Sequence, residues 1–566
     1  MIADARLGAA LRELRAWGFA PSGNRGGVRR FVGDLHCRSQ AVRVELHISD
    51  WDFLSYPPIK VLEGIDKSVL APHIDPQGWL CYLQHGSVVL DRFAPAKAIS
   101  QCLEQARCVL EDIKFDPAYR TRDIQDEFLS HWLNGPSTRI HHVLMGTIKP
   151  NAKSTQYWLL ECPDGPQAML ADDRDEVSAI ANALGGQAVA RETACPCWLF
   201  RSDVPPAVPE RMPGTVKELF RWLQAWDPKV YHAMQRVLDH EKSYLEFKHA
   251  SFAVHTRAGW LGVAFELDPL HRQGAKRRPS LYRQHLHGKG GARGLMRLVI
   301  DELGPEFVHS RNLRFQDLRG KRIQLVGCGA IGSHVAEGLV RLGAGSGGGR
   351  LTLVDPETLG PENLGRHALG YPSLFKGKAV AMRDELKRQF PMSNVDAIDK
   401  PAQEVGALFR ADLVVDATGE EALSEQLNAR RLDSGTKTPV LHTWILGNGE
   451  GVQSLWCQGR THACYRCGLL LPRTDGARQE RYSVLEAAAE RRLIGCRAFT
   501  PYAVGAPIAA AALALEVIGD WLQNGGDPSP RFRTRLTARA KARRVKSQDA
   551  APLGGCPACG AGSDAA

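Results

Sequence analysis

The sequence lacks a hydrophobic run long enough to cross a membrane. A spanning helix needs roughly 20 apolar residues, and the longest candidate, residues 506–522, is interrupted by Glu516 and Asp520. Residues 1–19 mix charges with apolar residues at helical spacing, which is typical of an amphipathic helix rather than a secretion signal. We therefore expect a soluble cytoplasmic protein with no membrane partner.

The sequence also lacks the features of a nucleic-acid binder. The net charge of +10 is modest for 566 residues. The basic segments 276–293 and 531–546 carry almost none of the interleaved aromatic residues that single-strand binders use. We interpret both segments as solvated loops and an exposed strand edge, and we expect no specific nucleic-acid partner.

The composition is that of an ordinary globular protein, with 44% apolar and 24% charged residues. The length predicts roughly three or four domains, and we divide the chain into residues 1–135, 136–300 and 301–566. The pattern predicts a multidomain α/β protein, with a small N-terminal α+β domain and a middle α/β linker region without a recognisable chemical constellation. From residue 301 onward, alternating strands and helices indicate a doubly wound domain.

A nucleotide site is indicated within that third region. An apolar strand leads into Gly327, Gly329 and Gly332, and a helix follows. In this GxGxxG arrangement the glycines allow a tight turn, and the helix N-terminus presents N–H groups to phosphate. A second strand ends in Asp355, which is placed to accept hydrogen bonds from a ribose. Taken alone, these features would make a dinucleotide dehydrogenase the default hypothesis.

The residues after Asp355 favour a different reaction. Asn363, Arg366 and Lys378 follow it, and preorganised cations suit a reaction that splits a triphosphate. The spacing D-x7-N-x2-R, followed by Gly-Lys, resembles the MoeB/ThiF family and the ubiquitin-activating enzymes over about residues 305–562. The resemblance implies that Asp355 binds the ATP ribose and that Arg366 and Lys378 bind the phosphates, assisted by Asn363.

The resemblance also implies an arginine finger and a magnesium ligand. Arg311 matches the finger, which a second subunit supplies in many family members. The family's magnesium-binding Asp is replaced by Gly419 in "VVDATGEE", so Asp416, Glu420 or ATP itself would hold Mg²⁺. The alternative for Asp416 is a strand-end residue that caps the next helix.

The 14 cysteines point to metal binding and catalysis, since thiols stay reduced in the cytosol. Four of them form two CxxC pairs, Cys464 with Cys467 and Cys556 with Cys559. Four thiolates make the closed tetrahedral site of structural zinc, and the long gap between the pairs agrees with the activating-enzyme family. A coincidental pair of motifs or a redox pair is the alternative.

Cys496 is a candidate for covalent catalysis. Arg497 follows it and Arg491 and Arg492 lie nearby, an electropositive setting that lowers the pKa of a thiol. In activating enzymes that form a thioester, the cysteine lies on a loop at this place, ahead of the closing helix. The alternative is a buried cysteine beside an apolar helix.

Cys81 follows the segment "PHIDPQGWL" and a proline-rich strand end, "YPPIKV". This order resembles the bacterial branch of the ubiquitin-conjugating enzymes over about residues 5–115. It departs from the eukaryotic HPN pattern, because Ile74 and Asp75 follow His73. Oxyanion stabilisation would then come from backbone N–H groups, from His73 or from another residue. Read alone, Cys81 favours a core side chain over a reactive thiol.

The order of domains resembles the fused activating and conjugating enzymes of bacterial CBASS anti-phage operons. The resemblance implies a homodimer, a middle region related to a degenerate adenylation domain, and ligation of the C-terminus of a cGAS-like nucleotidyltransferase to amine-bearing targets. ATP with magnesium would adenylate that C-terminus, and Cys496 would pass it as a thioester to Cys81. The alternatives are a sulfur-carrier adenylyltransferase of the MoeB/ThiF type, another bacterial ubiquitin-like conjugation system, or a non-enzymatic scaffold.

Overall fold

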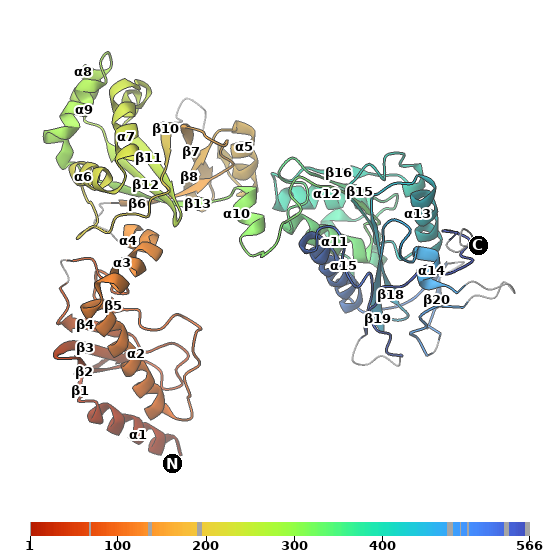
Figure 1. Cartoon of the computed structure of the whole chain (residues 1–566), viewed down its shortest axis with the longest axis horizontal. Helices are drawn as coiled ribbons and strands as arrows, with labels where there is room; N and C mark the ends of the chain where they lie inside the picture. The colour runs from red at the N-terminus through yellow and green to blue at the C-terminus, as the bar shows by residue number, and fades with distance from the viewer. Residues whose placement is uncertain are drawn as a thin grey trace. The chain divides into compact units, whose positions relative to one another are not determined.

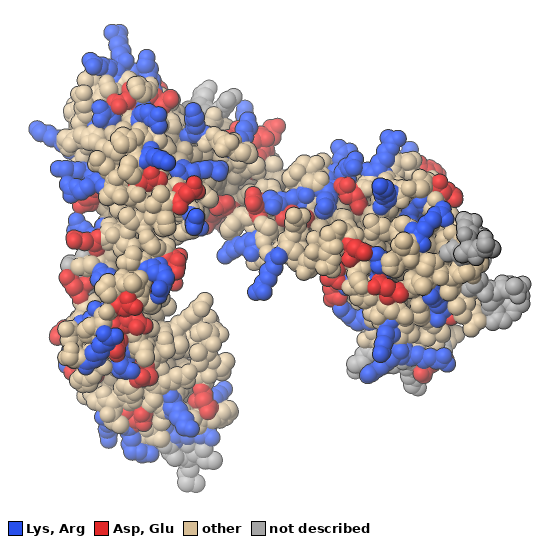
Figure 2. Space-filling model, viewed as in Figure 1, with Lys and Arg blue, Asp and Glu red and all other residues tan. Residues whose placement is uncertain are grey.

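The chain forms two compact units in a computed structural model (Figure 1). The structure describes residues 2–66, 69–133, 139–188, 195–471, 479–486, 488–494, 497–536 and 543–560. The first unit comprises residues 1–172 and 188–301, and the second comprises residues 173–187 and 302–566. On the face shown in Figure 2, Lys and Arg side chains are scattered among Asp and Glu.

The N-terminal part of the first unit is an antiparallel sheet covered by two helices. The strands follow one another in sheet order. They are β1 (Ala20–Arg25), β2 (Val28–Cys37), β3 (Gln40–Ile48), β4 (Ile59–Glu63) and β5 (Trp79–Leu80). Helix α1 (Ile2–Ala16) packs on helix α2 (Pro95–Phe115). The periodic apolar residues of α2, among them Ala98, Cys102 and Val109, are buried in the core with strands β2 to β4.

The second part of the first unit is an eight-stranded mixed sheet in the order β10-β11-β12-β13-β6-β8-β7-β9, in which β10 also pairs with β7. The strands are β6 (Arg139–Met145), β7 (Ser154–Cys162), β8 (Gly165–Ala171), β9 (Gln187–Ala188), β10 (Cys195–Arg201), β11 (His249–Thr256), β12 (Gly259–Glu266) and β13 (Met296–Glu302). The helices of this part are α6 (Val216–Trp226), α7 (Pro228–His240), α8 (Pro269–Ala275) and α9 (Ser280–His287), whereas α5 (Arg174–Ala183) belongs to the second unit.

Two short helices join these two parts. Helix α3 (Pro117–Asp126) follows α2, and its N-cap Asp116 accepts hydrogen bonds from two backbone N–H groups of the first turn. Helix α4 (Phe128–Leu133) comes next. Their apolar side chains Ile124, Phe128 and Trp132 are buried in the same core as α6, α7 and the strands β11 and β12. The pair therefore continues the chain of the N-terminal part while packing in the core of the second part.

The second unit has a seven-stranded sheet in the order β16-β15-β14-β17-β18-β19-β22, with the first five strands parallel. The strands are β14 (Arg322–Val326), β15 (Arg350–Val354), β16 (Val395–Ile398), β17 (Leu413–Asp416), β18 (Val440–Leu446), β19 (Gly451–Cys457) and β22 (Phe532–Leu536). A separate pair comprises β20 (Arg492–Ile494) and β21 (Arg497–Phe499). The helices are α10 (Pro305–Ser310), α11 (Ala330–Arg341), α12 (Lys378–Gln389), α13 (Glu421–Asp433), α14 (Tyr465–Leu469) and α15 (Gly505–Gln523).

This sheet bears out the doubly wound pattern expected from the sequence. All four residues of β17 are buried, as in a parallel strand covered on both faces. Strand β22 lies at the sheet edge, as the interpretation of residues 531–546 predicted for part of that basic segment. Helix α15 is long and apolar enough to cross a membrane by length and composition alone. Its residues Ala510, Ala514 and Val517 lie in the core, which accounts for that composition.

Candidate active sites

Cys81 directly follows the short strand β5, and its side chain is exposed to solvent. Its backbone N–H donates to the carbonyl oxygen of His73 at 2.8 Å, which closes the loop between the two residues. Every other cysteine that the structure describes is buried or half-buried. The Cys81 thiol is therefore accessible to an acyl donor.

Asp75 and Ile74 build the loop that presents this thiol. The Oδ1 atom of Asp75 accepts hydrogen bonds from the N–H groups of Gln77 and Trp79, at 2.9 and 2.8 Å. This is an Asx-type turn, in which the side chain organises its own loop. Ile74 forms a β-bridge to strand β5 and packs against the domain core. The two residues that depart from the HPN pattern thus shape the loop.

His73 has a left-handed backbone with φ of 56°, a conformation that costs free energy for a residue other than glycine. Its Nε2 atom lies 3.1 Å from the Tyr119 hydroxyl and 3.1 Å from Oδ2 of Asp123. Its Nδ1 atom lies 4.0 Å from Oε2 of Glu127. Burial, together with the charges of Glu127 and Asp123, raises the pKa of the Cys81 thiol. The resting thiol is therefore protonated at neutral pH.

The glycine-rich turn of the second unit is a tight cradle. Gly327 has φ of 85°, and a Cβ atom there would lie 2.8 Å from the Thr418 side chain. A Cβ on Gly332 would lie 1.8 Å from the Gly327 carbonyl oxygen, whereas the corresponding position at Gly329 is open. Gly329 is the N-cap of α11 and, with Gly327, lines a cavity of about 530 Å³. Backbone N–H groups at such a helix end bind phosphate, so the cradle fits a nucleotide.

Asp355 lines the same cavity and is 5% exposed. Its carboxylate accepts from the N–H groups of Cys328 at 2.6 Å and Glu357 at 2.8 Å. An ionised carboxylate has about four acceptor positions, which leaves two for a ribose. Burial raises the pKa of Asp355. Lys378 is buried at the start of α12, and its ammonium pairs with Glu357, which also lines the cavity.

The other predicted nucleotide ligands, Arg366, Asn363 and Arg311, differ in their contacts and in their relation to this cavity. The Arg366 guanidinium lies over the ring of Tyr502, a lining residue, at 5.1 Å. Asn363 accepts a hydrogen bond from the Gly360 N–H at 3.0 Å and closes a turn. Arg311 is exposed at the end of α10 and does not belong to the described residues that line the cavity.

Asp416 is 1% exposed, and its own chain occupies both carboxylate oxygens. Oδ1 accepts from the N–H and the hydroxyl of Thr418, at 3.1 and 2.7 Å. Oδ2 accepts from the Ser424 hydroxyl and lies 2.8 Å from Nδ1 of His442. Burial alone would raise the pKa of Asp416. The partners of its carboxylate outweigh burial and hold this pKa below its usual value, and His442 contributes most to the lowering. With four contacts the carboxylate has no free position for magnesium.

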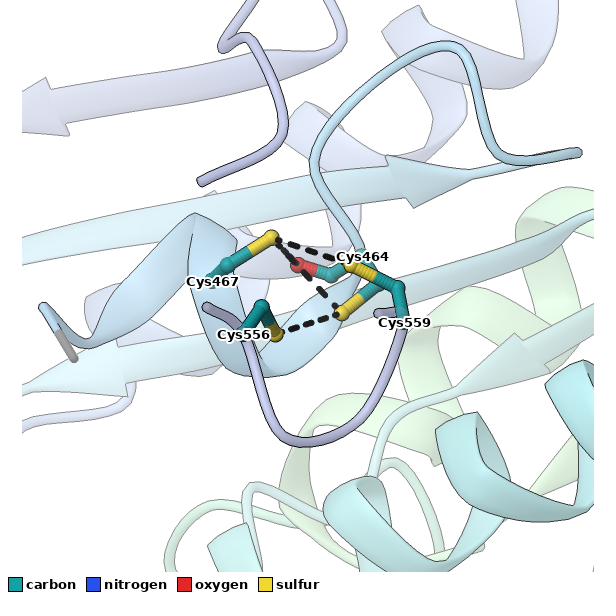
Figure 3. A group of neighbouring side chains, drawn as sticks. All are labelled: Cys464, Cys467, Cys556 and Cys559. Carbon is teal, nitrogen blue, oxygen red and sulfur yellow. Dashed lines mark hydrogen bonds between the residues drawn. The ribbon is translucent and has the colours of Figure 1, made fainter. Parts of the chain in front are cut away.

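The two CxxC pairs come together in one buried cluster (Figure 3). The sulfur of Cys464 lies 3.7 Å from that of Cys467 and 3.9 Å from that of Cys556, and the sulfurs of Cys467 and Cys559 are 3.8 Å apart. Tetrahedral zinc with Zn–S bonds of about 2.3 Å requires sulfurs about 3.8 Å apart. The four thiols therefore fit a closed zinc site.

Cys496 lies outside the described residues, so its prediction is untested. The strands β20 and β21 on either side of it pair with each other, with Ile494 opposite Arg497. The closing helix α15 begins at Gly505, as the sequence predicted. A cavity of about 780 Å³ reaches from Thr418, beside the nucleotide turn, to Arg491, next to β20. Its aromatic lining residues are Trp444, Tyr465, Tyr482, Tyr502 and Phe532.

Several residues that contact the predicted site residues were not predicted from the sequence. His367 is buried with Nε2 2.7 Å from the Cys328 carbonyl oxygen, and burial lowers its pKa to about 4. Glu357 pairs with Lys378, and His442 pairs with Asp416. None of them stands in a recognisable motif. The nearest signal is that Glu357 lies two residues after the strand-end acid.

Two family models match the chain. The ThiF family matches residues 301–556, and the prokaryotic E2 family B matches residues 27–135. The ATP-dependent ubiquitin transferase-like protein Cap2 of Pseudomonas aeruginosa is 29% identical over 518 residues, covering 90% of each chain. The molybdopterin-synthase adenylyltransferase of Escherichia coli is 30% identical over 182 residues, covering 31% of this chain and 68% of its own. The solved structure of Escherichia coli MccB gives a TM-score of 0.34 at 19% identity, covering 43% of this chain and 66% of its own.

A ThiF-type activating domain and a prokaryotic conjugating domain in one chain define an ATP-dependent fused enzyme of ubiquitin-like conjugation, and the chain belongs to this class. Over most of its length it is a homologue of the ATP-dependent ubiquitin transferase-like Cap2 proteins of Pseudomonas aeruginosa and Escherichia coli. The resemblance, the fold class and the enzyme class predicted from the sequence are thus confirmed.

Proposed function

We propose that the enzyme joins a protein C-terminus to target amines in three steps. ATP adenylates the C-terminal carboxylate in the cavity at Gly327 and pyrophosphate leaves. The Cys496 thiolate then displaces AMP, and Cys81 takes the acyl group by transthioesterification before an amine attacks it. The observation that carries this proposal is the exposed Cys81 thiol in a conjugating domain whose own chain contains an activating domain.

In the nucleotide site we propose Asp355 as the ribose ligand, and Arg366, Lys378 and Asn363 as phosphate-binding residues. Lys378 would exchange Glu357 for phosphate, since the two are already paired at the cavity edge. Magnesium would be held by the phosphates and by Glu420, which is exposed and lines the cavity. The saturated Asp416 supports this choice.

We further propose that the activated C-terminus belongs to a cGAS-like nucleotidyltransferase and that the enzyme works as a cytoplasmic homodimer. The dimer is supported by Arg311, because an exposed arginine outside its own cavity suits a finger donated to a second subunit. Neighbouring genes for a cyclase and a deconjugating peptidase would separate a CBASS role from another bacterial ubiquitin-like system.

Trapped intermediates test the reaction. In Cys81→Ser, the acyl group should stop on residue 81 as a stable ester, and mass spectrometry would then name the carrier protein. In Cys496→Ser, the ester should form on residue 496, and Cys81 should receive nothing. A carrier that reaches Cys81 in the Cys496→Ser variant would contradict the proposed order.

A sulfur-carrier adenylyltransferase is the second candidate, favoured by the likeness to the molybdopterin-synthase adenylyltransferase. In that case Cys81 would be structural. Peptide mapping after a non-reducing gel distinguishes the two, because the proposed function predicts a thiol-sensitive conjugate on Cys81 that is lost in Cys81→Ala, while the thioester on Cys496 and ATP–pyrophosphate exchange persist. A scaffold without catalysis is ruled out if exchange depends on Lys378 and Arg366.

A further inference from the structure

Beside Cys81 lies a cavity of about 670 Å³ with largely apolar walls. These walls come from strands β4 and β5, from the segment before His73, and from Met212, which lies between β10 and α6. The apolar lining residues are Val61, Ile65, Val69, Leu70, Ala71, Ile74, Leu80 and Met212. Such a cavity is suited to an extended hydrocarbon group that approaches the thiol.

The polar rim of this cavity carries a net negative charge. Glu127 lines it with a side chain that is 52% exposed. Arg211 also lines it, but its guanidinium pairs with Glu218 at 3.1 Å. Burial lowers the pKa of His131, so this lining residue is neutral at neutral pH. The carboxylate of Asp75 is held by its own turn.

Of the two carboxylates whose charges raise the pKa of the Cys81 thiol, Glu127 is the one available to a substrate. Asp123 lies against Nε2 of His73, which also contacts the Tyr119 hydroxyl. Glu127 lies farther from the imidazole, at 4.0 Å from Nδ1, and half of its side chain faces solvent. Glu127 lines the same cavity as Cys81, and the charges of both carboxylates raise the pKa of its thiol.

We propose that this cavity takes the aliphatic stem of an acceptor lysine and that Glu127 binds its ammonium and removes the proton. The methylenes of a lysine pack well on apolar walls while its charged end seeks a polar partner. The inference rests on the proposed function and deepens it, because it names the acceptor as a long-chain primary alkylamine and assigns a general base.

The proposed step is aminolysis of the Cys81 thioester. Glu127 accepts one proton from the ammonium, and the freed lone pair on nitrogen attacks the carbonyl carbon of the Cys81 thioester. A C–N bond forms and the C–S bond breaks, and the electron pair leaves on the sulfur. The second proton of the attacking nitrogen passes to that thiolate, whose raised pKa favours the protonated product. Glu127 then releases its proton to solvent.

The middle domain holds this base in place. Glu127 lies between α3 and α4, and the next residue, Phe128, is fully buried and stacks on Trp222 of α6 with ring centroids 5.7 Å apart. Nearby, Gln125 donates to the Pro206 carbonyl oxygen at 3.1 Å. Residues 136–300 would thus complete the conjugating site, a role the sequence did not indicate.

A chase experiment on the full chain tests the inference. In the Cys496→Ser background, the exposed Cys81 is acylated with a short peptide thioester ending in glycine, and a Cys81→Ser sample reports acylation elsewhere. The acyl enzyme is then mixed with Nα-acetyl-lysine or with hydroxylamine, which is an uncharged nucleophile at pH 7.5. Loss of the acyl group is followed by intact-protein mass spectrometry.

We expect Glu127→Gln to slow discharge to Nα-acetyl-lysine by about 10²-fold, as for loss of a general base, and to leave discharge to hydroxylamine at the wild-type rate. Asp126→Asn is the matched control, because Asp126 is the exposed last residue of α3, directly before Glu127, and does not line the cavity; both rates should stay unchanged. Equal lysine rates in Glu127→Gln and wild type would overturn the inference and leave the proposed function standing. If Cys81 accepts no acyl group, both this inference and the proposed function are contradicted.

Discussion

At the scale of single residues, Gly332 shows how closely the nucleotide turn is packed. A Cβ there would lie 1.8 Å from the carbonyl oxygen of Gly327, far inside contact distance. We expect Gly332→Ala to lower the free energy of unfolding by about 1–3 kcal/mol, because backbone must shift to admit the methyl group. Urea denaturation measures this. Gly329→Ala is the matched control, since no heavy atom lies within 4 Å of its added Cβ. Equal stabilities for the two variants would contradict the account.

The buried pair of His442 and Asp416 predicts a pH dependence of stability. Burial opposes protonation of His442, but its hydrogen bond to Asp416 outweighs this and raises its pKa to about 9. The unfolded value is near 6.5, so the stabilisation is fully present below about pH 6.5 and is lost as the pH rises through about 9. Thermal melts of wild type and His442→Gln from pH 6 to 9.5 measure it. The difference in Tm should shrink as the pH rises, and a constant difference would refute the prediction.

Motif residues could be predicted because their chemistry is local. Gly327 and Gly332 stand at fixed spacing around a strand and a helix, and in the structure Gly327 follows β14 while Gly332 lies in the first turn of α11. His442 and Glu357 could not be predicted, because their meaning comes from partners 26 and 21 residues away. Asp75 was interpreted as a departure from a motif, whereas its side chain organises the loop before Cys81.

At the scale of elements, we expect the fold of α14 to depend on zinc held by the four clustered cysteines. These cysteines bring the start of α14 against the segment near residue 556. We expect Cys467→Ala to bind less than one equivalent of zinc and to expose the backbone of α14, because binding free energy at such sites is also folding free energy. Elemental analysis and hydrogen exchange measure the two effects. Cys162→Ser, outside the cluster and half-buried, should keep its zinc; loss of zinc there would show that the cluster is not the site.

Elements with a clear apolar period were predictable, and elements defined by distant pairing were not. Helix α2 carries its buried apolar residues at helical spacing, and β12 is an apolar run within its own residues. The closure of the middle sheet through β10 and β7 could not be foreseen, because these strands lie about 40 residues apart and pairing leaves no local signal. The short helices α3 and α4 were also missed, since their apolar residues match a core that lies later in the chain.

At the scale of the whole molecule, Cys81 and the nucleotide cavity at Gly327 lie in units with separate cores. We therefore expect Cys81→Ala to abolish conjugate formation while ATP–pyrophosphate exchange stays at the wild-type rate. Because Cys81 is exposed, the free energy of unfolding should change by less than about 0.5 kcal/mol. Radiolabelled pyrophosphate exchange and a melting curve measure both. A fall in exchange would mean that Cys81 acts earlier in the reaction than proposed.

The packing of α3 and α4 limits how the enzyme can be recombined. These helices extend the conjugating domain in sequence but fill the core of the middle domain through Phe128 and Trp132. A chimaera that imports residues 1–115 from a relative would keep its host's Asp123 and Glu127 beside a foreign cysteine loop. One that imports residues 1–133 would force foreign aromatic residues into the host's core. We therefore expect a functional exchange to require both domains together, residues 1–300, rather than the conjugating domain alone.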